Sequence, residues 1–266
     1  MKRRLAAWVF AASSATSVCA CGGETEGKVV PLMIAVEPEP DDGAALGEFT
    51  TSSGWHVQLT QAQLGVAALY LYTPRREQEP SAVAQLLDLL VPVAHAHGAF
   101  DPLNGRAVRA EYRDLVALDL LGDGVQELGE VSAEAGPSDG LSLELVGPGD
   151  DLPEALHGHS AWVAGEAERD GVTVRFEGGI DLPDQGAIRR VESVESNVQI
   201  DEGQTLLLRV HPSRWLLEAD FSRLAPPAGE DGPSAITAED QVGRAWYIGV
   251  RNPAAFSVEI VEGELP

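Results

Sequence analysis

The stretch AWVAGEAERDGVTVRF, residues 161–176, decides the fold class. Apolar side chains recur at every second position over 161–167 and again over 172–176, which is typical of strands with one face in a hydrophobic core. Arg169-Asp170-Gly171 joins the two runs. Asp-Gly between alternating runs is the strongest short signal for a hairpin, because glycine readily adopts the positive φ of a tight turn. We therefore predict an antiparallel β-hairpin at this position.

Similar patterns on both sides of the hairpin extend the prediction to the rest of the chain. Helical signals are few: residues 81–91 end at Pro92, and residues 237–250 begin with the capping-box-like Thr237-Ala238-Glu239-Asp240. Many short strands with turns between them predict an all-β fold, an antiparallel β-sandwich with one or two short helices. Strands are predicted at 55–72 with a bend near Gly65, and at 106–121, 128–135, 141–145, 187–200, 204–210 and 255–261.

The N-terminus has the pattern of an export signal. Lys2, Arg3 and Arg4 precede a short apolar run, which changes into small residues before position 21. The run is too short for a transmembrane helix, which needs about 20 apolar residues. The end of the segment, Val18-Cys19-Ala20-Cys21, resembles the lipobox of bacterial lipoproteins, with an aliphatic residue three positions before the modified cysteine and a small residue directly before it.

The lipobox resemblance implies cleavage before Cys21 and several acyl chains on that residue. Several chains give a permanent anchor, whereas a single chain binds a membrane only marginally. The residue after Cys21 is Gly22 rather than Asp, and this resembles the sequence of lipoproteins that are sent to the outer membrane. We therefore expect a cell-envelope protein that faces the periplasm or the cell surface. The alternative is an ordinary signal peptide, with Cys21 unmodified or paired to Cys19. The chain contains 2 cysteines, and both lie in this segment.

The mature chain is strongly acidic. Loss of residues 1–20 removes three basic residues and no acidic ones, and this changes the formal charge from −24 to −27. Such a charge attracts cations and repels nucleic acid, so no nucleic-acid partner is expected. Residues 21–47 are acidic and rich in Pro and Gly apart from 29–36. We expect a tether with one short strand there, followed by a β-sandwich domain over 48–266.

Two sequence patterns resemble a hydrolase motif and a calcium-binding loop, but each lacks a feature that such a site requires. Gly136-Pro137-Ser138-Asp139-Gly140 matches the G-x-S-x-G motif of hydrolases, but it lies between predicted strands, whereas a nucleophile elbow joins a strand to a helix. We interpret it as a hairpin turn. The acidic residues Asp119, Asp123, Asp150 and Asp151 do not have the ligand spacing of a calcium loop. No catalytic residues and no enzymatic activity are predicted.

The histidines give the strongest functional signal. Four of the 6 form two His-x-His pairs, His95-Ala96-His97 and His157-Gly158-His159. In an extended segment, residues two apart point to the same side with Cα atoms about 7 Å apart, so two imidazoles can converge on one ion. Each pair follows a Pro-containing connection at the predicted edge of the sandwich. We predict a metal site with His95, His97, His157 and His159 as ligands.

Other residues could supplement this site. His56 and His211 are further imidazole ligands, and Asp101 could serve as an oxygen ligand or orient a histidine. The alternative is a set of surface histidines with no common focus. Trp55, Trp162, Trp215 and Trp246 are expected in the core, although clustered aromatic rings could also stack on a glycan.

The ligand types restrict the metal. After acylation of Cys21 the mature chain has no free thiol, and its one methionine is Met33. Imidazole ligands without sulfur suit Cu(II), Zn(II) or Ni(II), with affinity rising toward copper. The sequence therefore predicts a lipid-anchored envelope protein that binds copper or zinc. The alternative is a structural or adhesive lipoprotein that binds another envelope protein or a glycan without metal.

Overall fold

The computed structural model describes residues 27–41, 43–74, 100–101, 106–122, 124–148, 150–183, 188–227, 229 and 232–263. The expected signal segment with Cys21, the helix predicted at 81–91, and the pair His95 and His97 lie outside these residues.

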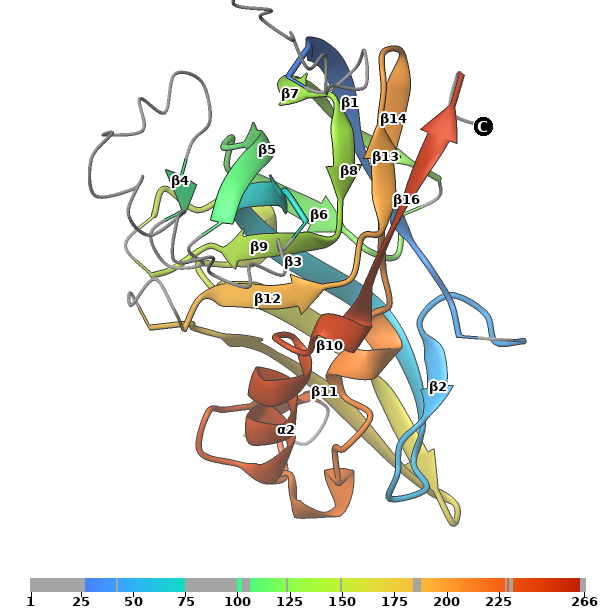
Figure 1. The fold of residues 1–266 in the computed structure, drawn as a ribbon. Coiled ribbons are helices and arrows are strands. Elements are labelled where there is room, and N and C mark those ends of the chain that lie inside the picture. Colours follow the sequence, from blue (N-terminus) through green and yellow to red (C-terminus); the bar gives the residue numbers. More distant parts are fainter. Residues whose placement is uncertain are drawn as a thin grey trace, which may run out of the picture.

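The described residues are mainly β-strands, as predicted, with one α-helix and four short 3-10 helices (Figure 1). The helices are α2 (Gln241–Gly249), η1 (Glu154–Leu156), η2 (Pro212–Trp215), η3 (Phe221–Arg223) and η4 (Pro253–Ala255). The strands are β1 (Val29–Pro38), β2 (Glu48–Thr50), β3 (His56–Tyr72), β4 (Phe100–Asp101), β5 (Arg106–Tyr112), β6 (Val116–Asp119), β7 (Gln126–Glu134), β8 (Gly136–Ser138), β9 (Gly140–Leu145), β10 (Ala161–Arg169), β11 (Val172–Ile180), β12 (Arg190–Val194), β13 (Val198–Ile200), β14 (Gln204–Val210), β15 (Ser234–Ile236) and β16 (Phe256–Glu262).

The predicted hairpin is confirmed. Strands β10 and β11 pair antiparallel from Ala161↔Ile180 to Arg169↔Val172. Asp170 (φ 54°) and Gly171 (φ 77°) are both left-handed, as a two-residue type I′ turn requires. The strands predicted at 55–72, 141–145 and 204–210 are confirmed as β3, β9 and β14. The segment predicted as one strand over 106–121 divides into β5 and β6, which pair with different parts of β3.

The long strand β3 organises the sheet, whose main path is β15-β11-β10-β3-β5-β7-β1-β14-β16. One edge of β3 pairs first with β10 and then with β9, and the other edge pairs with β2, β6 and β5. The change from β10 to β9 falls at Gly65, the predicted bend, where a Cβ would lie 2.3 Å from Val146 Cγ2. The chain between β9 and β10 leaves the sheet at this point, and it carries His157 and His159.

The all-β fold class is confirmed, but the sheet is mixed rather than purely antiparallel. Strand β1 runs parallel to β14, and β11 runs parallel to β15. Long stretches of chain separate the strands of both pairs, and such connections permit a parallel arrangement that a hairpin does not. A second, two-stranded sheet joins β8 to β13.

Strand β1 corrects the predicted boundary of the tether. It lies between β7 and β14, and Leu32, Ile34 and Val36 are fully buried in the core. The segment Val29–Pro38 is therefore part of the folded domain, although it falls within the range 21–47 expected to be a tether. The Pro, Gly and acidic residues on both sides of this strand dominated the composition of the range.

Helix α2 is the central part of the helix predicted at 237–250. It begins after Asp240, whose carboxylate accepts a hydrogen bond of 2.6 Å from Gly243 N and another from Thr237 N. Its buried Trp246 packs into the core, and Gly249 lies against the backbone of Trp215 in η2. Among the described residues, no helix has the length and apolar character needed to cross a bilayer.

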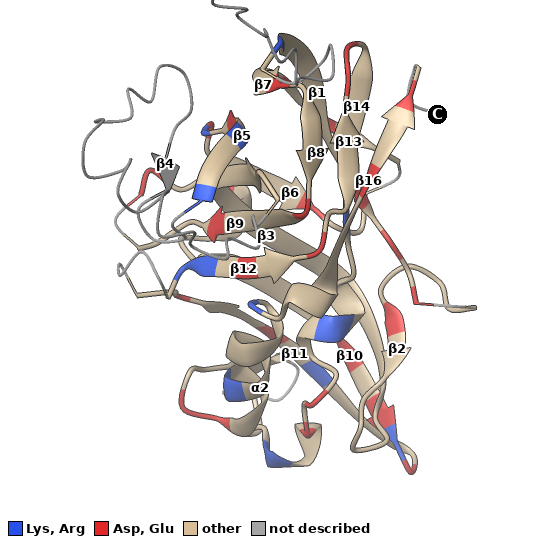
Figure 2. Ribbon diagram, viewed as in Figure 1, with Lys and Arg blue, Asp and Glu red and all other residues tan. Residues whose placement is uncertain are grey.

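Acidic residues occur along strands and loops in most parts of the ribbon, and basic residues are fewer (Figure 2), as expected for 42 Asp and Glu against 18 Lys and Arg.

Candidate functional site

The pair His157 and His159 lies in a tight turn after η1. His157 N donates to Glu154 O (3.0 Å), and His159 N donates to Leu156 O (2.9 Å). His157 (φ 51°) and Gly158 (φ 83°) are both left-handed. The prediction that this pair lies in an extended segment is therefore wrong. The fully buried Leu156 fixes the turn against the sheet below it.

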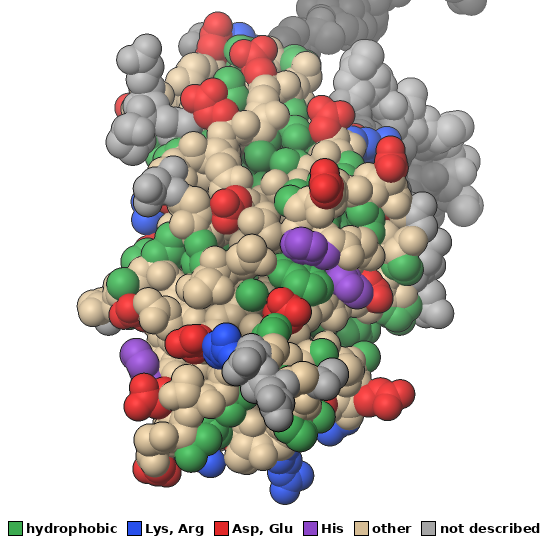
Figure 3. Space-filling model, turned by 180° about the vertical axis from the view of Figure 1, so that it is seen from behind, with side chains coloured by type: hydrophobic (Ala, Val, Ile, Leu, Met, Phe, Trp, Pro, Cys, Tyr) green, Lys and Arg blue, Asp and Glu red, His purple; other side chains and the backbone are tan. Residues whose placement is uncertain are grey.

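Both imidazoles nevertheless lie against one indole, that of Trp162 on β10. The ring centroids of His157 and Trp162 are 4.4 Å apart with an interplanar angle of 36°, and those of His159 and Trp162 are 5.7 Å apart with an angle of 24°. The indole is itself oriented, because Trp162 Nε1 donates to Gln61 Oε1 (3.1 Å). Figure 3 shows two neighbouring histidine side chains next to hydrophobic surface on this side of the molecule.

Strand β11 and the residue that follows it hold His159. Asp181 Oδ1 lies 3.1 Å from His159 Nδ1. Gly179 faces Trp162 across the strand pair, and a Cβ at Gly179 would lie 2.1 Å from His159 Cγ. The ring of His159 therefore occupies the space that any larger residue at position 179 would fill.

This site contains the imidazoles of His157 and His159 and the carboxylate of Asp181, which is within hydrogen-bond distance of His159. Within the described ranges, no group of three or more His, Cys, Asp or Glu side chains has the arrangement of a metal site. His157 and His159 therefore form half of the predicted set, and the other half, His95 and His97, lies outside the description. The expected supplements are located elsewhere.

The structure does not place His56 or His211 near this pair. His56 is exposed at the start of β3 and pairs with Glu168, whereas Trp162 pairs with Gln63 further along the same strand. His211 follows β14, and its Nε2 lies 3.4 Å from Glu39 Oε2. Asp101, the predicted oxygen ligand, belongs to β4, which pairs with β5. The described contacts of His56 and His211 are therefore not with His157 or His159, and the side chain of Asp101 lies outside the described part of the chain.

The residues that sequence reasoning missed are Gln61, Gly179 and Asp181. Trp162 was predicted as a core residue, and it is half-buried with its ring against the two histidines. Trp55, Trp215 and Trp246 are buried in the core as predicted. Asp181 directly follows β11, but the predicted hairpin strand ended at Phe176, and the position of Asp181 next to the histidine turn depends on tertiary structure.

Three residues of the weaker chemical patterns, Ser138, Asp119 and Asp150, have structural partners, and Asp123 lies outside the described residues. Ser138 is buried between β8 and β9, and its hydroxyl lies 3.2 Å from Ser196 Oγ. Because β8 pairs with β13 and β9 pairs with β12 and β3, the motif forms a corner between sheets rather than the predicted hairpin turn. Asp119 accepts from Leu121 N, and Asp150 accepts from Gly147 N. Both carboxylates thus stabilise turns.

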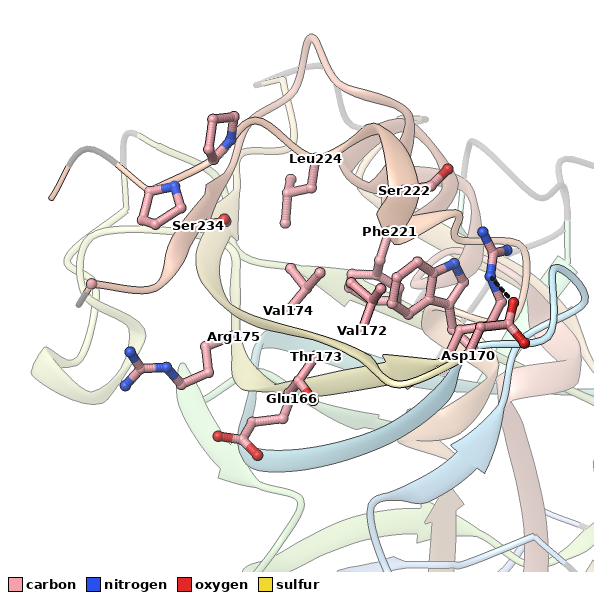
Figure 4. A pocket seen from close by; sticks show the side chains of 15 residues that line it. Glu166, Asp170, Val172, Thr173, Val174, Arg175, Phe221, Ser222, Leu224 and Ser234 are labelled. Atoms are coloured by element: carbon pink, nitrogen blue, oxygen red, sulfur yellow. Dashed lines mark ion pairs between the residues drawn. The ribbon is translucent and has the colours of Figure 1, made fainter. Parts of the chain in front are cut away.

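A pocket of about 690 Å³ lies beside the tip of the β10–β11 hairpin. Val172 and Val174 point toward Phe221 and Leu224, while Thr173 and Glu166 point to the other side of the strand (Figure 4). At one end of the pocket, the Arg169 guanidinium lies over the Trp55 ring at 4.6 Å from its centroid. Asp220 Oδ1 accepts from Trp55 Nε1 (3.2 Å) and from Ser222 Oγ (2.8 Å).

Asp220 is expected to contribute an acid-sensitive part of the stability. Hydrogen bonds from the side chain and backbone of Ser222, with smaller effects of Trp55 and Arg169, hold the pKa of Asp220 below its usual value against the opposing effect of burial. This stabilisation is present above the unfolded-state pKa of about 3.9 and is lost as pH falls through the folded-state pKa. Asp220→Asn should therefore lower the free energy of unfolding by about 1 kcal/mol at pH 7, and by less near pH 3.

Urea unfolding at the two pH values measures the effect of Asp220→Asn. Asp170→Asn is the control, because Asp170 is 92% exposed in the hairpin turn of the same pocket. An equal loss of stability at both pH values in Asp220→Asn would contradict the assignment.

Comparison with known proteins gives little similarity. No family model matches the chain, and no curated protein matches it. Among solved structures, the chain is similar to MbnP from Methylosinus trichosporium, with 14% identity, a TM-score of 0.40, and coverage of 88% of this chain and 99% of that one. Values of this size do not carry a function or a site over to this chain.

Proposed function

We propose that this protein is a lipid-anchored cell-envelope protein that binds Cu(II) or Zn(II) through His157 and His159. The observation that carries the proposal is the contact of both imidazoles with one indole, together with the bond from His159 to Asp181. Two histidines brought together, one of them oriented by a carboxylate, are typical of imidazole metal sites. The lipobox resemblance at Cys21 supports the anchor.

The charge of the protein supports binding of a cation. A formal charge of −24 for the whole chain raises the local concentration of divalent ions around it. This attraction is diffuse and does not distinguish metals, whereas imidazole ligands favour copper over zinc and both over calcium or magnesium. Site-specific binding is therefore expected to resist salt, and diffuse binding is not.

The metal proposal is tested by calorimetric titration of Cu(II) and Zn(II) in about 0.15 M salt, with the chain expressed without its signal and Cys21. We expect saturable binding with near-integer stoichiometry, lost in the double variant His157→Ala/His159→Ala. At a metal concentration about 100 times Kd, the native state should gain about 2.7 kcal/mol of stability. Because both imidazoles contact Trp162, Cu(II) should also quench the emission of this residue.

His56→Ala is the matched control, since it removes an exposed imidazole from the far end of the same strand pair. It should bind as the wild type does. A third variant, His95→Ala/His97→Ala, tests the other predicted pair independently. Binding that is unchanged in His157→Ala/His159→Ala, or absent from the wild type, contradicts the metal proposal and leaves a protein-binding or glycan-binding lipoprotein.

The proposed role is binding rather than catalysis. The hydroxyl of Ser138 bonds to Ser196 within a buried sheet corner, which supports a structural role for the one hydrolase-like motif. The pocket beside the hairpin favours the alternative of a protein partner, because its Val172 is 56% exposed and lies beside Val174 and Leu224. Three of the four tryptophans expected in the core are buried there, which disfavours a glycan-stacking surface.

A further inference from the structure

The contact between His159 and Asp181 decides which nitrogen of the imidazole carries a proton. An ionised carboxylate only accepts hydrogen bonds. The 3.1 Å approach of Asp181 Oδ1 to His159 Nδ1 is therefore a hydrogen bond when Nδ1 carries the proton. In the neutral ring, Nε2 is then the nitrogen with a free lone pair.

The backbone holds Asp181 in place through the residue next to His159. Ser160 N donates to Ile180 O (2.9 Å), and Leu182 N donates to Ser160 Oγ (3.0 Å). These bonds fix the residues on both sides of Asp181 against the residue that follows His159. The backbone of Asp181 is thus fixed next to the imidazole, and the carboxylate, whose side chain is 52% exposed, contacts His159 Nδ1 from this position.

The remaining contacts of the ring leave Nε2 as its available ligand atom. Gly179 approaches Cβ, Cγ and Cδ2 of His159, where an added Cβ would lie 2.6, 2.1 and 2.2 Å from these atoms. One face of the ring stacks on Trp162, and Nδ1 faces Asp181. The side chain of His159 is nevertheless 33% exposed.

We infer that Asp181 is a positioning residue that fixes the Nδ1–H form of His159 and so makes Nε2 the metal-binding atom. The inference rests on the proposed function for its consequence, metal binding, but the protonation pattern exists without metal. Carboxylates that hold a ligating histidine in this way typically affect metal affinity by about 10- to 100-fold when they are removed.

Nuclear magnetic resonance of the 15N-labelled mature chain without metal tests the first part. Long-range 1H–15N correlations, recorded at about pH 8.5 and thus well above the reference histidine pKa of about 6.5, distinguish Nδ1–H from Nε2–H. We expect His159 in the Nδ1–H form in the wild type, and a shift toward the Nε2–H form in Asp181→Ala. Asp181→Asn should give a mixture of the two forms, because its side-chain amide can either accept a hydrogen bond from Nδ1–H or donate one to an unprotonated Nδ1.

Metal affinity of the same variants tests the second part. Asp181→Ala should bind Cu(II) or Zn(II) about 10- to 100-fold more weakly, with Asp181→Asn intermediate. Glu168→Ala controls for the loss of one negative charge, because Glu168 is exposed and lies six residues from Trp162 on β10. It should leave both the proton position and the affinity unchanged.

The outcomes separate this inference from the proposed function. A wild-type His159 in the Nε2–H form, or a proton position unaffected by Asp181→Ala, overturns the inference even if the metal binds at His157 and His159. If the wild type binds no metal but Asp181→Ala moves the proton, the role of Asp181 in positioning His159 stands and the metal proposal fails.

Discussion

Trp246→Ala is expected to lower the free energy of unfolding by about 3–5 kcal/mol, the range observed when large buried aromatic residues are truncated. Trp246 is 0% exposed and is among the largest side chains of the core. It lies on the buried face of α2, whose Gly249 contacts the backbone of Trp215. Truncation therefore leaves a cavity between the helix and the sheet that neighbouring side chains fill only in part.

Denaturation in urea, followed by circular dichroism, measures this effect. Ile248→Ala is the control on the same helix, since Ile248 is 70% exposed and surface substitutions usually change stability by less than about 0.5 kcal/mol. Similar midpoints for Trp246→Ala and the wild type would show that α2 does not contribute to the core as described.

Arg109→Met is expected to destabilise the protein by about 1–3 kcal/mol, because it removes the buried donor of two carbonyl groups. The side chain of Arg109 is 4% exposed. Its Nε donates to Pro137 O (2.6 Å), its Nη1 donates to Ala135 O (2.9 Å), and Glu134 Oε1 lies 3.4 Å away. Methionine fills part of the volume but donates no hydrogen bond, so both carbonyl groups at the corner between β7 and β8 lose their donor.

Arg113→Met provides the comparison for Arg109→Met. Arg113 follows the same strand, pairs with Glu111 and is 69% exposed, and exposed ion pairs typically contribute less than about 1 kcal/mol. Urea midpoints that fall equally in the two variants would exclude a special role for the buried guanidinium.

Local patterns predicted many of the strands of this fold but not how the strands are arranged, and the segments 106–121 and 187–200 each divide into two strands. Alternation and the Asp170-Gly171 turn predicted the β10–β11 hairpin, because both signals act between neighbouring residues. The parallel pairing of β1 with β14 has no local signal, since the register depends on side chains far apart in the chain. For the same reason, β1, an interior strand of the sheet, was assigned to the tether.

The candidate site was likewise predicted only in part from the sequence. The spacing of His157 and His159 suggested convergence, and the structure brings both rings to Trp162, although through a left-handed turn rather than an extended strand. Asp181 was not predicted, because its approach to His159 depends on bonds between Ser160 and the end of β11. Whether His95 and His97 complete the site remains a prediction.

The position of β1 has a consequence for the order in which the chain can fold. Strand β1 begins at Val29, but its parallel partner begins at Gln204, in the last third of the chain. Contacts between residues so far apart require the closure of a long loop, and folding is slow in proteins rich in them. During synthesis, one edge of β1 lacks its native partner until β14 emerges. We therefore expect the native sheet to form late, after β14 has been synthesised.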